Sequence, residues 1–171
     1  MGRKIKNGYI WLLFLIIVFY IALNAMFMHF DTTPLLYDES EYYYGALMLY
    51  DSFLEMNFLD AVKHTFLYLP NRTMIKPFMM VAPASFFVLI FGKTEWITFA
   101  SNSLYVFVLV FSMYGIGRYL KNKRVGFFMG VSVLFLGPVY GFFRVFMPEF
   151  MLIALTALFY YLLLKSDKFS N

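Results

Sequence analysis

The sequence has 171 residues, which is about the length of one domain. Hydrophobic residues make up 62% of it and charged residues only 14%, whereas soluble proteins average about 25% charged residues. The 23 Phe, 14 Tyr and 12 Met carry more apolar surface than a small soluble domain can bury, so we expect lipid to solvate much of the chain. The net charge of +4 is spread over short clusters, which argues against a nucleic-acid partner, and the absence of Cys excludes disulfides and thiolate sites.

The first predicted transmembrane helix covers Ile10 to Met28, an uncharged stretch that would be about 28 Å long as a helix. It follows Arg3, Lys4 and Lys6, and its apolar core is too long for a signal peptide, so we expect an uncleaved anchor. Three further spans are predicted over Trp96 to Gly117, Val125 to Phe143 and Phe150 to Leu164.

The apolar stretch Pro77 to Gly92 is short and contains two prolines, so its path is decided by charge. If it crossed the membrane, the basic cluster from Arg118 to Arg124 would lie outside, against the positive-inside rule. If it lies on the outer face or re-enters it, most of the 14 Lys and Arg are cytoplasmic. We therefore expect an all-α, polytopic membrane protein with four spanning helices and one re-entrant or surface helix; five spans is the alternative.

Residues 31–72 form the first non-cytoplasmic loop on either topology, because they follow the first span. The loop holds most of the ten acids of the chain. Within it, Tyr43, Ala46, Leu47 and Tyr50 are spaced as one face of a helix, and Phe58 to Leu69 is a second amphipathic run. We expect both segments to be helices on the membrane surface. Nothing suggests a second domain, so 1–171 is interpreted as a single membrane domain.

A few charged residues lie near the outer face and are candidates for chemistry: Asp38, Glu39, Arg72, Lys76, Arg144 and Glu149. Such a group suits a lipid-phosphate substrate, because Lys and Arg bind phosphate oxygens through charge-assisted hydrogen bonds. A carboxylate can take the proton of an acceptor hydroxyl or hold a divalent metal ion, for which Asp38 and Glu149 are the candidate ligands.

Each of these residues also has a purely structural interpretation. Asp38 would cap a helix, with Glu41 three residues later completing a capping box. Glu149, after Pro148, would favour the dipole of its helix. Arg144 and Lys76 would extend their charges to lipid headgroups.

The order of these motifs resembles the N-terminal part of the C-type membrane glycosyltransferases, above all the protein O-mannosyltransferases and the lipid A aminoarabinose transferases. The segment YDESEYYYGALML is similar to the family's first-loop Asp-Glu motif, which falls on Asp38 and Glu39. The segment IKPF resembles its Lys-Pro-Pro segment, with Lys76 matching the carrier-phosphate contact and Phe78 replacing the second Pro. RVFMPEF resembles its Arg-to-acid segment, which falls on Arg144 and Glu149.

The resemblance implies transfer of a sugar from a polyprenyl-phosphate carrier to a lipid, glycan or protein acceptor at the non-cytoplasmic face. Asp38 and Glu39 would be the catalytic acids, with Asp38 as the base or metal-contacting residue, and Glu149 would be a supporting acid. Lys76, Arg144 and Arg72 would bind the lipid phosphate. The resemblance implies no certain cofactor, and a divalent metal ion is the one candidate.

Family members are several times longer, so we expect this chain to be the N-terminal part of a transferase. We expect a multi-pass protein of a bacterial or archaeal plasma membrane, with the N-terminus cytoplasmic. Two alternatives stay open: a non-enzymatic subunit or degenerate remnant that packs with a longer partner, and a small transporter.

Overall fold

The computed structural model describes residues 8–31, 34–35, 37–57, 59 and 77–166, and all of their regular secondary structure is helical. Its elements are α1 (Gly8–Phe30), α2 (Tyr37–Leu54), α4 (Phe78–Phe91), α5 (Trp96–Leu120), α6 (Lys123–Ser132), the 3-10 helix η1 (Val133–Phe135), α7 (Gly137–Arg144) and α8 (Pro148–Lys165). The all-α prediction is therefore confirmed for these residues. Most of the second predicted surface helix, Phe58 to Leu69, lies outside them.

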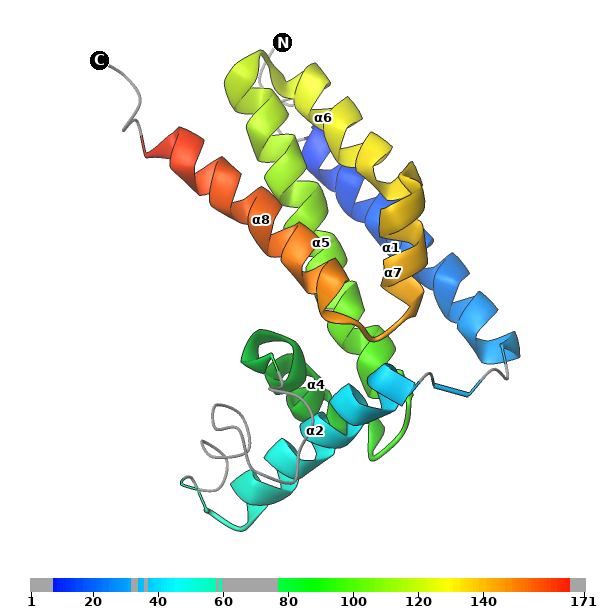
Figure 1. The fold of residues 1–171 in the computed structure, drawn as a ribbon. Coiled ribbons are helices and arrows are strands. Elements are labelled where there is room, and N and C mark those ends of the chain that lie inside the picture. Colours follow the sequence, from blue (N-terminus) through cyan, green and yellow to red (C-terminus); the bar gives the residue numbers. More distant parts are fainter. Residues whose placement is uncertain (1–7, 32–33, 36, 58, 60–76, 167–171) are drawn as a thin grey trace.

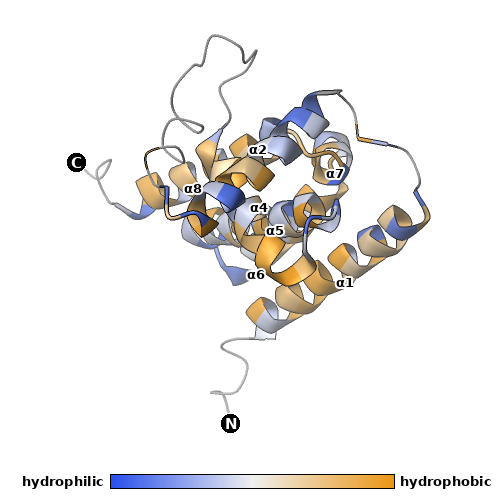
Figure 2. Cartoon of the chain, turned by 90° about the horizontal axis from the view of Figure 1, so that it is seen from below, coloured by the Kyte–Doolittle hydropathy of each residue, from blue (hydrophilic) through white to orange (hydrophobic). Residues whose placement is uncertain are grey.

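Helix α5 is the centre of the bundle, with α1, α6 and α8 beside it (Figure 1). Its sequence contains small residues that allow close contact with α6. A Cβ added to Gly117 would lie 2.7 Å from the Gly126 Cα atom, so the two backbones touch at this point. Seen from one end, hydrophobic residues cover much of α1 and α6 on the outside of the bundle (Figure 2). Such a surface is suited to lipid and not to water.

Among the described residues, three helices, α1, α5 and α8, are long and apolar enough to cross a membrane, which supports a polytopic membrane protein. The predicted span Val125 to Phe143 is not one straight helix, because this segment consists of α6 with η1 and then α7, bent by 58°. Whether the bent pair crosses the membrane as one broken span stays a prediction. Pro138 favours the break: it is the second residue of α7, lacks an N–H, and so cannot donate to the Leu134 carbonyl as a continuous helix would require. If the bent pair forms one span, four segments could cross the membrane.

Helix α4 occupies most of the ambiguous stretch Pro77 to Gly92 and folds back along the first half of α5. The turn between them begins at Gly92, whose φ of 69° favours glycine. Pro83 cannot donate to the Met79 carbonyl four residues earlier, and the Tyr105 hydroxyl of α5 donates to that carbonyl instead. At 14 residues, α4 is about 21 Å long and shorter than a hydrocarbon core of about 30 Å. Whether it re-enters the membrane stays a prediction.

Helix α2 lies beside α4 at one end of the bundle (Figure 1). Its most buried apolar side chains are Tyr42, Ala46 and Leu49, while Tyr43 and Leu47 of the predicted face are half-buried. An exposed ion pair joins Lys93 in the α4–α5 turn to Asp51, with 2.8 Å between nitrogen and oxygen. Helix α2 therefore packs on protein along one side instead of lying only on lipid.

Candidate functional site

Four of the predicted site residues lie at the end of the bundle where α2 begins. Asp38 and Glu39 lie in the first turn of α2, Arg144 ends α7, and Glu149 lies in the first turn of α8. Figure 1 shows the start of α2 and the α7–α8 connection at this same end. Lys76 and Arg72 lie outside the described residues. Because α2 begins at Tyr37, Asp38 lies inside the first turn and not at the predicted cap position.

Glu39 links α2 to the connection between α7 and α8. Its side chain is 5% exposed, and its Oε1 atom accepts a hydrogen bond of 2.6 Å from the Phe146 backbone N–H. From the other side, the Asn102 side chain of α5 donates to the carbonyls of Phe143 and Val145 at 3.0 and 2.8 Å. The backbone that follows Arg144 is therefore fixed by two buried side chains.

Arg144 is fixed by contacts with α1 and with its own helix. Its guanidinium carbon lies 3.7 Å from the centre of the Phe27 ring and 4.0 Å from that of Tyr140, so both contacts are of the cation–π type. Its Nε atom donates to Asn24 Oδ1 at 2.8 Å. Asn24 is itself buried, and its amide donates to the Tyr20 carbonyl. The side chain is thus bound in one orientation, unlike a cation that only extends toward lipid headgroups.

A cavity opens beside Arg144. Its volume of about 420 Å³ is typical of small-molecule sites. It combines one cation, Arg144, with three acids, Asp31, Glu39 and Glu95, and with aromatic walls. Its lining residues are Phe27, Met28, Asp31, Pro34, Leu35, Glu39, Glu95, Trp96, Thr98, Phe99, Gly141, Arg144 and Val145. Within the described residues no carboxylate forms an ion pair with Arg144, so its charge is available to an anion.

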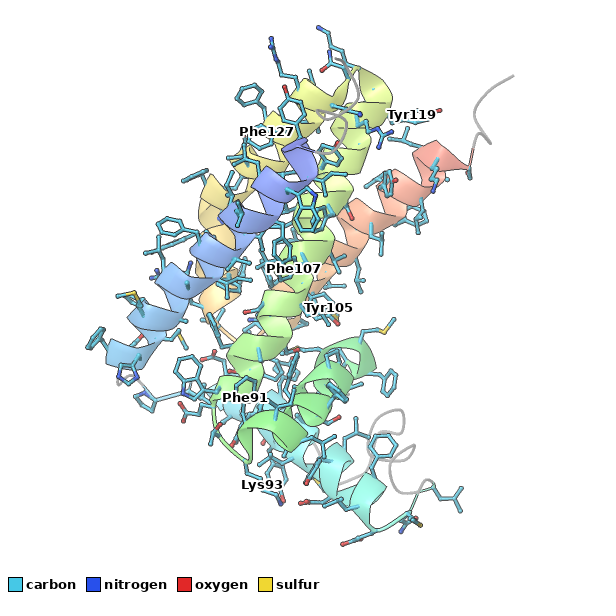
Figure 3. The ribbon with its side chains drawn as sticks, turned by 180° about the vertical axis from the view of Figure 1, so that it is seen from behind. Phe91, Lys93, Tyr105, Phe107, Tyr119 and Phe127 are labelled. Atoms are coloured by element: carbon cyan, nitrogen blue, oxygen red, sulfur yellow. The ribbon has the colours of Figure 1, made fainter. Side chains whose placement is uncertain are left out.

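An apolar groove of about 590 Å³ adjoins this cavity, because Trp96 and Phe99 line both. The groove runs between α1, α4 and α5 and is lined almost wholly by hydrocarbon and aromatic rings. Figure 3 shows two of its residues, Phe91 near the end of α4 and Phe107 in the middle of α5. The site therefore has a charged space and a hydrocarbon-lined space side by side.

The other two predicted acids lie close to Tyr42. Burial raises the pKa of the Tyr42 phenol above 10.0, and the nearby carboxylates of Asp38 and Glu149 raise it further. Within the described residues, the Glu149 Oε2 atom is buried and has no hydrogen-bond donor. Such an atom is costly to leave unpaired, so it is a point where a substrate hydroxyl would be favoured.

The predicted metal ion would need several ligand side chains close together. In the described part of the chain, no group of three or more His, Asp or Glu side chains is arranged to hold a metal ion. In that part of the chain Asp38 and Glu149 share only the neighbourhood of Tyr42, and a metal ion at these two acids stays a prediction.

Sequence reasoning missed several residues of this site. Asn24 and Asn102 orient Arg144 and the α7–α8 connection, and Trp96 joins the cavity to the groove. The two Asn could have been found from the sequence, because each is a polar residue inside an apolar span, where its amide needs a partner in the protein. Trp96 gives no such signal, because Trp is common at membrane boundaries.

Comparison with models of known protein families, with curated proteins and with solved structures found no match to this chain.

Proposed function

We propose that this chain is a membrane glycosyltransferase, or the N-terminal part of one, that uses a polyprenyl-phosphate sugar at the non-cytoplasmic face. The observation that carries the proposal is the junction at Trp96 and Phe99 between a cavity containing Arg144 and an apolar groove. A polyprenyl-phosphate sugar has the same two parts, an anionic polar head and a long hydrocarbon chain. The order of motifs along the sequence supports the reaction type.

Arg144 would bind the carrier phosphate. With Nε bonded to Asn24 and the guanidinium plane placed against two rings, its terminal N–H groups are left for phosphate oxygens. The polyprenyl chain would follow the groove between α1, α4 and α5. Lys76 and Arg72 keep their predicted phosphate contacts in this proposal.

The transfer is a substitution at the anomeric carbon. The acceptor hydroxyl forms the new C–O bond while the bond from sugar to phosphate breaks and its electron pair leaves with the phosphate. Asp38 takes the hydroxyl proton, and Arg144 stabilises the charge that grows on the phosphate. A single displacement inverts the configuration of the sugar. Glu39 acts as a positioning residue, because it holds the Phe146 N–H just beyond Arg144.

The test is a transfer assay on membranes that contain this chain, with a panel of labelled polyprenyl-phosphate sugars. Asp38→Asn removes the base and is expected to lower the transfer rate by about 100-fold or more. Glu55→Gln is the matched control, because Glu55 is an exposed acid just beyond the end of the same helix. Unimpaired transfer by Asp38→Asn would show that Asp38 is not the base. If the unaltered chain transfers no sugar from any carrier, a non-enzymatic subunit becomes the better interpretation.

A further inference from the structure

A second cavity, of about 970 Å³, lies between α1, α5 and α8 at the end of the bundle away from Arg144. Figure 1 shows that the first turn of α1 and the last turns of α5 and α8 lie at this end, and that the ends of α5 and α8 diverge. On α5 the lining extends from Phe107 to Tyr119, which is about 18 Å along the helix (Figure 3). The cavity is therefore long as well as large.

The lining changes in character along its length. Phe107, Val108 and Leu158 give it an apolar inner part, whereas Arg118 and Lys165 lie at its outer end in the last turns of α5 and α8. Each cation interacts favourably with the C-terminal dipole of its own helix. The helix dipoles do not explain why both cations line the same cavity. In the described part of the chain, neither cation has a carboxylate partner.

We propose that this cavity binds an anionic membrane phospholipid. Its phosphate headgroup would lie against Arg118 and Lys165, and one acyl chain would extend past Val108 to Phe107. Charge complementarity selects this occupant, because a basic pocket between transmembrane helices on the cytoplasmic side attracts anionic headgroups. The Arg118 end is also the end that the charge distribution predicts to be cytoplasmic.

The shape of the cavity supports an acyl chain. The Tyr161 ring of α8 packs directly on Gly115 of α5, where an added Cβ would lie 2.4 Å from a ring carbon. This contact holds α8 against α5 at one point, while the helix ends beyond it diverge to admit the headgroup. The inference does not depend on the proposed transferase function, because it concerns the other end of the molecule.

The experiment measures phospholipid retained by the purified full chain. Protein is reconstituted in nanodiscs containing equal amounts of phosphatidylglycerol and phosphatidylcholine with identical acyl chains, extracted in mild detergent, and weighed by native mass spectrometry. The unaltered protein is expected to retain phosphatidylglycerol in preference. Arg118→Gln and Lys165→Gln should each weaken this retention about fivefold, since one basic residue near anionic lipid contributes about that factor.

Lys121→Gln is the matched control, because Lys121 is an exposed cation at the same end that does not line the cavity. A further variant, Val108→Trp, fills the apolar part without changing charge and should lower retention of both lipids. Thermal unfolding of each variant verifies that it is folded. If the cavity variants lose no more phosphatidylglycerol than Lys121→Gln, or if Val108→Trp retains as much lipid as the unaltered chain, the proposal is wrong.

Discussion

Asp38 and Glu39 are neighbours in sequence but lie in different surroundings, because successive residues of a helix are about 100° apart around its axis. Glu39 is buried and accepts the Phe146 N–H, so its oxygen is used for structure. Asp38 is half-buried and lies near Tyr42, as does Glu149. In the described part of the chain Asp38 accepts no hydrogen bond, which leaves it available to take a proton. The two adjacent acids therefore suit different roles.

The grouping of Tyr42 with these acids predicts a measurable titration. Because burial and the two carboxylates raise its pKa above 10.0, the Tyr42 phenol keeps its proton in the folded protein at pH values where an unfolded chain loses it. Glu149→Gln removes one carboxylate and should shift the Tyr42 pKa part of the way back toward 10.0, with burial keeping it above that value. The measurement is NMR of ¹³C-labelled tyrosine, with Tyr42→Phe assigning the signal.

The sign of the stability effect follows from the same shift. The contribution of Tyr42 is fully present below pH 10.0 and is lost as the pH rises through its higher folded pKa. Glu55→Gln, which changes an acid beyond the end of α2, should leave the titration unchanged. An unaltered Tyr42 pKa in Glu149→Gln would mean that the two side chains do not lie close together.

At the scale of helices, backbone geometry determines how the bundle packs. Helices α5 and α6 touch at Gly117 and Gly126, where only glycines allow such a close approach. The bend between η1 and α7, next to Pro138, brings the end of α7 back to α5 and so carries Arg144 to the site. Without that bend, a straight helix would place Arg144 elsewhere.

Two glycine substitutions should have opposite effects on stability. Gly117→Ala puts a methyl 2.7 Å from the Gly126 Cα atom and should destabilise the protein by about 1–3 kcal/mol, because the backbone of α6 must move. Gly141→Ala, inside α7, meets nothing within 4 Å and should stabilise by up to about 1 kcal/mol through helix propensity. Thermal unfolding of both variants in one detergent measures the difference. Equal unfolding temperatures would contradict the α5–α6 contact.

At the scale of the whole molecule, charge separates the two ends of the bundle. The end with α2 and the α7–α8 connection holds the acids of α2 and the candidate site. The other end holds the start of α1 and the basic residues from Arg118 to Arg124. Between them, α1, α5 and α8 are long and apolar enough to cross a membrane. This arrangement agrees with a cytoplasmic N-terminus by the positive-inside rule.

Because the chain has no Cys, single cysteines can report which end faces outward. Lys93→Cys, in the exposed turn before α5, should react with a membrane-impermeant maleimide added to intact cells. Lys121→Cys, at the other end, should react only after the membrane is opened. The exposed Lys93–Asp51 ion pair contributes little to stability, so its loss should not unfold the protein. Labelling of Lys121→Cys in intact cells would reverse the predicted topology.

The residues themselves determined much of this protein, because hydrophobicity and charge act locally. A long uncharged stretch favours a helix in lipid wherever it packs, so the sequence predicted α1, α5 and α8 within a few residues of their observed bounds. It also predicted the helix α2, whereas the side of the membrane on which each charge cluster lies stays a prediction. The bend near Pro138 had a local signal that a hydropathy criterion alone does not use.

Only the tertiary structure decided which side chains meet. The bonds from Glu39 to Phe146, Asn102 to Phe143 and Arg144 to Asn24 join residues far apart in sequence. Each depends on how its helix is rotated and where it crosses its neighbour, which no local pattern specifies. The cavity beside Arg144 and the one beside Arg118 arise in the same way, from the spaces that packed helices leave between them. The sequence thus determined the helices and the ends at which their charges lie, and packing created the sites.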